Sequence, residues 1–301
     1  MTKVLVSDHV DIGRLALGPG FEVDYRPGIA RDELMKLIKD CDALVVRSRT
    51  KVDRELLDRA RRLKVVARPG TGLDNVDVEY ARSKGIQVVN SPESLVEAVA
   101  EQVLLLMLAL SRKLPMAAAT TSAGRWEKEA LMGVELRGKV LGIVGFGRIG
   151  RRIGEVARVV GMSLLVYDVV QIPPDLVAQS GCKVVGLEEL LSGADYITLH
   201  VPMTDQTRHM LDGRRLSMMK RSAFLVNTSR GGVIDEHALT DALRQGRLAG
   251  AALDVFEKEP PAGEILTAPN AILTPHIGGQ TAEAQSDAIV VVGEKLRAFF
   301  K

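Results

Sequence analysis

The stretch Lys139-Val-Leu-Gly-Ile-Val-Gly-Phe-Gly-Arg-Ile-Gly150 joins an apolar run of strand length to the beginning of a helical pattern. Its three glycines each suit dinucleotide binding: Gly145 permits a tight turn, Gly147 lets the backbone approach a pyrophosphate, and Gly150 lets the helix pack close to the strand. Free N–H groups at the beginning of that helix would attract the phosphates. The stretch therefore predicts a doubly wound, nucleotide-binding domain.

Glycines at this spacing also occur in ordinary turns, so their context matters. The next expected strand, 162–168, ends in Asp168, 18 positions after Gly150, about where a carboxylate that binds ribose hydroxyls is expected. Val169 and Val170 follow, with no arginine to meet a 2′-phosphate. The pattern favours NAD over NADP.

Length and composition describe an ordinary globular protein. The 301 residues suffice for about two domains, and a net charge of +2 gives no reason to expect nucleic acid or a membrane as a partner. Cys41 and Cys182 are too few and too far apart for a disulfide framework or a zinc site, so we expect reduced thiols in a cytosolic protein and no metal. The first residues suit a strand rather than a secretory signal, and the most apolar segment, 98–110, is too short to span a bilayer.

Before Pro92, strand-like runs alternate with helix-like ones, which favours a parallel sheet wrapped by helices. The expected strands are 4–7, 43–47, 64–68 and 86–89, and the expected helices are 31–40, 52–63 and 76–84. A long core helix is predicted from Ser91, as its cap, to Leu110. Residues 115–138, with the only tryptophan, are either a surface excursion or an arm that packs on another subunit or overhangs the substrate.

From Lys139 the alternation resumes. Six strands are expected, at 140–144, 163–167, 196–200, 224–227, 251–254 and 271–274. Helices fall between them, including 148–160 and 236–245, and this arrangement fits a doubly wound nucleotide fold. A last helix, 282–300, follows the completed sheet and could return to cover the first domain.

In an open parallel sheet the ligand lies beyond the carboxyl ends of the strands, and several polar residues fall there. His200 is either catalytic or part of the wall of the cofactor site, and we favour the wall. Arg230 can grip a carboxylate or a ketone oxygen with its rigid fork of donors. His276 suits proton exchange with an alcohol or ketone, because the histidine side chain titrates near neutral pH. The segment 253–260 supplies acids, and a carboxylate beside the ring would favour the imidazolium.

At these residues the chain closely resembles the D-2-hydroxyacid dehydrogenase family. The resemblance rests on motifs such as Arg68-Pro-Gly-Thr-Gly-Leu-Asp-Asn-Val-Asp77 and Pro275-His-Ile-Gly278. The other matching stretches are 45–51, 90–101, 125–127, 145–150, 227–236 and 253–261. Because these ordered motifs extend over nearly the whole chain, coincidence is implausible.

The resemblance implies two doubly wound parallel-sheet α/β domains, a Rossmann NAD domain inserted into a flavodoxin-like substrate domain. Residues 1–92 and 280–301 would form the substrate domain and residues 93–279 the NAD domain, with the active site in the cleft. Arg230 would bind and polarise the substrate, His276 would act as the acid/base, and Glu259 would pair with His276.

The predicted ligand contacts fall in two groups. The residues expected around NAD are Gly145, Gly147, Arg148, Ile149, Gly150, Asp168, His200, Pro202, Thr207, Thr228, Ser229, Asp254 and Gly278. The residues expected around the anionic groups of the substrate are Arg47, Arg68, Gly70, Thr71 and Gly72, because arginine forks and the N–H groups of glycine loops bind anions. The expected partner is a small 2-hydroxy or 2-oxo acid, bound by a cytoplasmic homodimer.

Within the family, the sequence looks most like members that oxidise 3-phospho-D-glycerate to 3-phosphohydroxypyruvate at the entry to serine synthesis. The alternatives are a glyoxylate or hydroxypyruvate reductase, another D-2-hydroxyacid dehydrogenase or, from a different class, an NAD(H)-sensing binding protein. Two departures bear on this choice. Lys128-Glu-Ala130 is less basic than expected for a phosphate contact from this arm, and the chain stops at Lys301, so a serine-binding regulatory domain and feedback through it are not expected.

Overall fold

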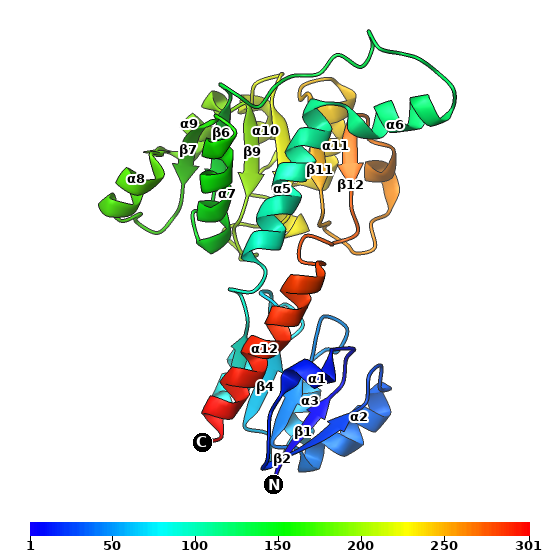
Figure 1. Cartoon of the computed structure of the whole chain (residues 1–301), viewed down its shortest axis with the longest axis vertical. Coiled ribbons are helices and arrows are strands. Elements are labelled where there is room, and N and C mark those ends of the chain that lie inside the picture. Colours follow the sequence, from blue (N-terminus) through cyan, green and yellow to red (C-terminus); the bar gives the residue numbers. More distant parts are fainter. The chain divides into compact units, whose positions relative to one another are not determined.

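The computed structural model describes all 301 residues. The chain separates into two compact units: Met1–Val96 with Gly279–Lys301 form the first, and Glu97–Gly278 form the second. The first unit is therefore assembled from both ends of the chain, and the helix α12 (Ala282–Phe299, red) lies among the blue N-terminal elements in Figure 1.

The first unit is built on a five-stranded, parallel sheet with the order β2-β1-β3-β4-β5. Its strands are β1 (Thr2–Val6), β2 (Phe21–Tyr25), β3 (Ala43–Val45), β4 (Val65–Arg68) and β5 (Gln87–Asn90). This is the flavodoxin-like order, in which the winding reverses between β1 and β3. Ligands of such sheets bind beyond the carboxyl ends of the strands.

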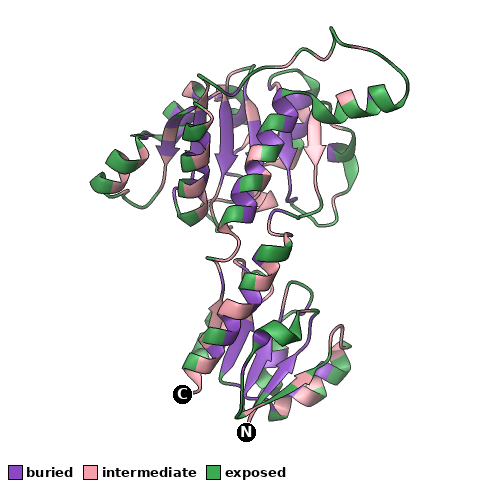
Figure 2. Cartoon of the chain, in the orientation of Figure 1, coloured by how far each residue is buried: buried purple, intermediate pink, exposed green.

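Helices cover both faces of this sheet. They are α1 (Ile12–Leu15), α2 (Arg31–Leu37) with the 3₁₀ turn η1 (Ile38–Asp40), α3 (Arg54–Arg59), α4 (Val78–Ser83) and α12. One apolar cluster joins Leu44 of β3 to Leu56 of α3, and the other joins Val4 of β1 to Val292 and Leu296 of α12. Figure 2 shows the strands as a buried layer between these helices. The last helix thus completes the core of the unit that the first strand begins.

The second unit carries seven parallel strands in the order β12-β11-β10-β9-β6-β7-β8. They are β6 (Val140–Val144), β7 (Ser163–Tyr167), β8 (Lys183–Val184), β9 (Tyr196–Leu199), β10 (Phe224–Asn227), β11 (Gly250–Leu253) and β12 (Ala271–Leu273). If β6 is counted as strand 1 and the sheet is followed from β8 to β12, the order is 3-2-1-4-5-6 with one further strand. This is the order of dinucleotide-binding folds. The winding reverses between β6 and β9.

The helices of the second unit pack on two apolar cores. They are α5 (Val96–Ser111), α6 (Leu114–Ser122), α7 (Arg148–Val159), α8 (Pro174–Ser180), α9 (Leu187–Gly193), α10 (Gly213–Met218) and α11 (Glu236–Arg244), with the 3₁₀ turns η2 (Gly231–Val233) and η3 (Gly263–Thr267). Met107 of α5 shares a core with Ile143 of β6, and Leu239 of α11 shares the other with Leu225 of β10. The predicted class, two doubly wound parallel-sheet α/β domains, is confirmed.

The bounds of several elements differ from the prediction by a few residues, and five elements differ more. Helix α5 begins at Val96 rather than Pro92, and Ser91 does not cap it, because the Ser91 hydroxyl accepts the N–H of Gly70 instead. Strand β2 and helix α1 were not predicted, since charged residues interrupt the apolar pattern of this edge strand and the helix has a single turn. Strand β8 was missed because it has only two residues. The stretch after Leu114 begins with helix α6.

Helices α5 and α6 are the most apolar part of the chain. No single helix is long and apolar enough to cross a membrane, and the two helices together pass that test only as a pair bent by 62°.

Candidate active site

The glycine turn after β6 lies at the carboxyl edge of the seven-stranded sheet. Gly145 has a φ of +93°, and a side chain there would clash with the backbone at the end of β9. A side chain at Gly150 would clash with the carbonyl oxygen of Gly145, so α7 packs tightly on the turn. Gly147, which precedes α7, faces open space. The turn therefore leaves an open approach to the first N–H groups of the helix, those of Arg148 and Ile149 among them.

Asp168 directly follows β7, beside the glycine turn. Its Oδ2 accepts the N–H of Phe146 at 2.7 Å, and its Oδ1 accepts the N–H of Val170 at 2.9 Å. Each oxygen has a further lone pair, so the carboxylate can still accept hydrogen bonds from ribose hydroxyls. Val169 and Val170 are 82% and 70% exposed, and neither offers a charge to a 2′-phosphate.

His200 follows β9, next to the same turn. Its backbone N–H donates to the carbonyl oxygen of Val144 at 2.7 Å. The Nε2 of its ring lies 2.7 Å from the hydroxyl oxygen of Thr198. Desolvation lowers the pKa of His200 to about 3, so the ring is neutral at physiological pH. This favours a place in the wall of the cofactor site over proton transfer. In the loop that follows, the Thr207 hydroxyl donates to the carbonyl oxygen of Pro202 at 2.6 Å.

The loop after β10 carries Arg230 and is shaped by the buried amide of Asn227. The Oδ1 of Asn227 accepts the N–H and the hydroxyl of Ser229 at 3.0 and 2.8 Å, and its Nδ2 donates to the carbonyl oxygen of Arg230 at 2.9 Å. Arg230 Nη1 donates to the carbonyl oxygen of Ser229 at 2.6 Å. The Thr228 hydroxyl is buried without a hydrogen-bond partner. A buried, unsatisfied hydroxyl suits a polar ligand, and the residues at this edge fit a dinucleotide.

Asp254 links the ends of β11 and β12 at the same edge of the sheet. Its carboxylate, 1% exposed, accepts the hydroxyl of Thr274 at 2.5 Å and the N–H groups of Ile277 and Gly278 at 2.9 and 2.8 Å. These donors lie on both sides of His276 in sequence. Asp254 therefore fixes the loop that presents His276.

His276 forms a hydrogen bond with Glu259. The Nδ1 of His276 lies 2.9 and 3.1 Å from the two carboxylate oxygens of Glu259. A carboxylate on Nδ1 favours the Nδ1–H tautomer and leaves Nε2 for a ligand. The φ of His276 is +54°, a conformation that side-chain-bearing residues rarely adopt and that is often held at functional sites. About half of the His276 side chain, 52%, is exposed, so the pair is accessible.

In the first unit, Arg47 follows β3, and Asp8 fixes its backbone. Asp8 is buried just after β1, where its Oδ2 accepts the Arg47 N–H at 2.5 Å and its Oδ1 accepts the Thr50 hydroxyl at 2.8 Å. The Asn75 amide donates to the carbonyl oxygens of Arg47 and Thr50, both at 2.7 Å. The Arg47 guanidinium makes a long contact, 3.5 Å, with the carbonyl oxygen of His9. Most of its donors remain available to an anion.

The loop Gly70-Thr-Gly72 follows Arg68 at the end of β4. Gly70 has a φ of +126°, and a side chain there would clash with the Arg68 guanidinium, so the glycine makes room for that group. The Gly70 N–H donates to the hydroxyl of the buried Ser91 at 2.8 Å, and the Asn90 amide donates to the carbonyl oxygen of Thr71 at 2.7 Å. The Thr71 hydroxyl is buried without a hydrogen-bond partner, which again suits a polar ligand.

Sequence reasoning missed the polar residues that support these loops. They are Asp8, Asn75, Asn90, Ser91 and Asn227. Asp8 and Asn227 carried a signal, because each stands at the carboxyl end of a predicted strand. Asn75 lies within the Arg68–Asp77 motif, but its role did not follow from that motif, because the residues it holds are 25 and 28 positions away.

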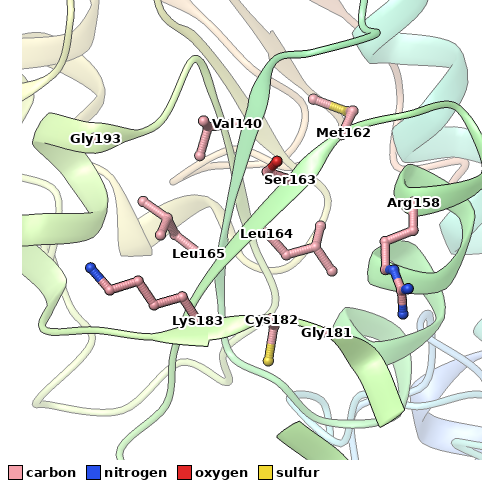
Figure 3. Close-up of a pocket in the computed structure, with 10 residues that line it drawn as sticks. All are labelled: Val140, Arg158, Met162, Ser163, Leu164, Leu165, Gly181, Cys182, Lys183 and Gly193. Carbon is pink, nitrogen blue, oxygen red and sulfur yellow. The ribbon is translucent and has the colours of Figure 1, made fainter. Parts of the chain in front are cut away.

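Two other features lie outside this set of residues. A hollow of about 530 Å³ is lined by Val140, Ser163 and Lys183, the first residues of β6, β7 and β8, so it opens at the amino ends of these strands (Figure 3). His237, Asp241 and Glu264 bring ligand-type atoms within 4.8 Å of one another, but Arg244 already donates to Glu264 at 2.6 Å. That no metal takes part stays a prediction.

The doubly wound second unit, with its open glycine turn and its carboxylate-paired histidine, defines a dinucleotide-dependent oxidoreductase as the class of protein. Residues 104–278 match the model of the D-isomer specific 2-hydroxyacid dehydrogenase family, NAD binding domain. The chain belongs to this family, whose members are NAD-dependent oxidoreductases.

Individual relatives agree with this assignment. The chain is 45% identical to a D-3-phosphoglycerate dehydrogenase of Methanocaldococcus jannaschii over 99% of its own length, but it spans only 57% of that relative. It is 44% identical to a hydroxypyruvate reductase of Thermotoga maritima, over 89% of this chain and 88% of that one. The crystal structure of D-lactate dehydrogenase from Aquifex aeolicus, in complex with NAD and lactic acid, superposes with a TM-score of 0.85 at 29% identity, over 99% of this chain and 96% of that one.

Proposed function

We propose that this protein oxidises 3-phospho-D-glycerate to 3-phosphohydroxypyruvate with NAD. The observation that carries the reaction type is the Glu259–His276 pair, presented at the same sheet edge as Arg230 and the glycine turn. The similarity to a D-3-phosphoglycerate dehydrogenase over nearly the whole chain supports the substrate. Such a reaction would begin a route to serine.

The residues of the second unit would divide the chemistry among them. His276 Nε2 accepts the proton of the substrate hydroxyl, and Glu259 stabilises the imidazolium that results. Arg230 donates to the same oxygen and to the neighbouring carboxylate, so it stabilises the developing carbonyl group. NAD, when bound, supplies the hydride acceptor. In the reverse direction His276 returns the proton.

The residues of the first unit would bind the anionic groups of the substrate. Arg47 and Arg68 offer planar forks that match carboxylate and phosphate oxygens. The loop Gly70-Thr-Gly72 adds backbone N–H groups, and the partnerless Thr71 hydroxyl supports this role.

Asp168 would select NAD. A 2′-phosphate near this carboxylate would meet a negative charge, and Val169 and Val170 offer no compensating cation. The N–H groups at the beginning of α7 would bind the pyrophosphate.

A second candidate is the reduction of hydroxypyruvate or glyoxylate. It is favoured by the relative from Thermotoga maritima, because that protein and this chain cover each other almost completely. A panel of 2-hydroxy and 2-oxo acids with NAD(H) and NADP(H) distinguishes the two: we expect NADH formation from 3-phosphoglycerate. Rapid NADH consumption with hydroxypyruvate or glyoxylate and none formed from 3-phosphoglycerate would establish the second candidate. NADH binding without turnover of any acid would indicate a nucleotide-sensing protein.

We also propose a homodimer. Apolar side chains are exposed on α5, α6 and the following stretch: Leu105, Leu108, Leu114, Met116, Trp126, Met132 and Val134. An exposed apolar surface of this kind commonly marks a protein interface. Sedimentation equilibrium tests it, with a monomer as the contrary result. A cytoplasmic location stays a prediction.

A further inference from the structure

Two glutamates connect the segments that carry the predicted catalytic groups. These are the Arg230 segment, residues 230–236, and the Glu259 segment, residues 256–259. The N–H of Glu236 donates to Oε1 of Glu257 at 3.0 Å, and the N–H of Glu257 donates to Oε2 of Glu236 at 3.2 Å. Each side chain thus holds the backbone of the other segment.

The backbones of the two segments also touch. A side chain at Gly231 would clash with the carbonyl group of Phe256 and the backbone nitrogen of Glu257. The N–H of Phe256 in turn lies 3.4 Å from Oε1 of Glu259, the carboxylate that pairs with His276. A continuous set of contacts therefore runs from the residue after Arg230 to the partner of His276.

A third segment supports both. His209, with a φ of +47°, places its Nε2 3.0 Å from Oε1 of Glu257. The backbone N–H of His209 donates to the carbonyl oxygen of Gly232 at 2.8 Å. The loop after β9 therefore fixes Glu257 and the Arg230 segment at once.

Helix capping accounts for only one of the two bonds, because the Glu236 N–H is the first N–H of α11 whereas the Glu257 N–H belongs to no helix. Asp235 already caps α11, because its side chain accepts the N–H of Ala238 at 2.9 Å. The glutamate pair also carries a cost: burial and the neighbouring charge of Glu257 raise the pKa of Glu236. Two acids are held together here although the N–H that the Glu236 side chain accepts, that of Glu257, belongs to no helix end.

We propose that Glu236 is a positioning residue for the dehydrogenase reaction, and that its exchange of hydrogen bonds with Glu257 sets the spacing of Arg230 and Glu259. The inference rests on the proposed function for the roles of these residues. Arg230 and His276 must reach the same substrate oxygen, one to polarise it and the other to exchange its proton. A misplacement of about 1 Å between such groups costs on the order of 100-fold in rate.

The test compares Glu236→Ala with Glu236→Gln, which keeps an oxygen for the Glu257 N–H. In the alanine variant we expect kcat/KM to fall about 10- to 100-fold, because both catalytic groups lose their spacing. The glutamine variant should restore most of the activity. The Kd of NADH should stay the same in both, since the glycine turn does not take part.

A matched control removes a similar bond at the opposite edge of the sheet. Asp195, which precedes β9, accepts the N–H of Val140 at 2.9 Å at the amino end of β6 and also pairs with Lys220 at 2.8 Å. Asp195→Ala should lower Tm without lowering kcat/KM. If Glu236→Ala lowers Tm to the same extent and leaves kcat/KM unchanged, Glu236 is merely structural and the inference is wrong.

Hydrogen exchange gives a readout that needs no turnover. Glu236→Ala should speed exchange in peptides from both segments, whereas Glu236→Gln and Asp195→Ala should not. Faster exchange in the Arg230 segment alone would overturn the inference even in an active enzyme. If the wild-type protein turns over no acid of the panel, the proposed function fails, and the exchange result still decides whether Glu236 couples the two segments.

Discussion

The glycine loops of the two units present different groups to an anion. Gly145–Gly150 leads directly into α7, a helix of 12 residues, so its attraction for phosphate comes from backbone N–H groups and the helix dipole. Gly70–Gly72 lies between Arg68 and an irregular stretch, and the next helix, α4, begins only at Val78. A helix end attracts phosphates in general, whereas arginine forks select the shape and placement of an anion. The first loop suits a constant cofactor, and the second suits the recognition of one particular acid.

The largest expected effect separates chemistry from binding. His276→Ala should lower kcat by about 10²- to 10⁴-fold, the usual contribution of a general acid or base, and Arg230→Ala should also lower it strongly. The Kd of NADH, measured by fluorescence titration, should hardly change in either. His237→Ala is the matched control. The side chain of this histidine is 75% exposed, but it lies on α11 and has no predicted part in the reaction. Turnover close to wild type in the His276 variant would remove His276 from the mechanism.

The glycines themselves allow the next comparison. In Gly150→Ala the new methyl group meets backbone, the carbonyl oxygen of Gly145, which cannot move without opening the turn. In Gly70→Ala it meets the end of a flexible side chain, that of Arg68, although the φ of +126° adds strain. We expect Gly150→Ala to lower the free energy of unfolding by about 3 kcal/mol, by analogy with severe overpacking, and Gly70→Ala by about 1 to 2 kcal/mol.

The two glycine variants should also differ in which ligand they bind less well. Gly150→Ala should weaken NADH binding, whereas Gly70→Ala should raise the KM of the acid and leave the Kd of NADH unchanged. Urea unfolding, fluorescence titration and steady-state kinetics measure the three quantities. The difference between the loops would be refuted by a Gly70→Ala variant that loses NADH affinity.

The sequence predicts the strands that carry these loops far better than the supports behind them. Apolar runs of strand length revealed β6, β7 and β12, and the positions of Asp168 and His276 shortly after strands followed from that pattern. Ser91 shows the limit: as a serine followed by a proline and a glutamate it matches common local signals for a helix cap, yet its hydroxyl binds the N–H of Gly70. Its partner is 21 positions away, and no local rule contains that pairing.

A smaller effect is expected at the cofactor. Asp168→Ala should lower the preference for NAD over NADP by about tenfold, the equivalent of roughly 1.4 kcal/mol, because a carboxylate that repels the 2′-phosphate and binds ribose hydroxyls is removed. Ratios of kcat/KM for the two cofactors measure this change. Glu155→Ala, which alters an exposed acid on α7, is the control. A wild-type protein that already prefers NADP would contradict the assignment.

The smallest effect concerns His200, and it appears in the stability of the protein rather than in turnover. His276 is paired with a carboxylate, whereas desolvation lowers the pKa of His200 to about 3. An unfolded histidine titrates near pH 6.5, so between about pH 6.5 and pH 3 the unfolded state binds the proton that folded His200 refuses. The free energy of unfolding should therefore fall as the pH drops through this range, by at most about 1.4 kcal/mol per pH unit from this group.

Urea unfolding of the wild type and of His200→Asn at pH 7.0 and 5.5 measures this fall in the free energy of unfolding. The free energy of unfolding should depend less steeply on pH in the variant. Equal slopes would mean that the ring is solvated, and the argument that favours a place for His200 in the wall of the cofactor site over proton exchange would lose its basis.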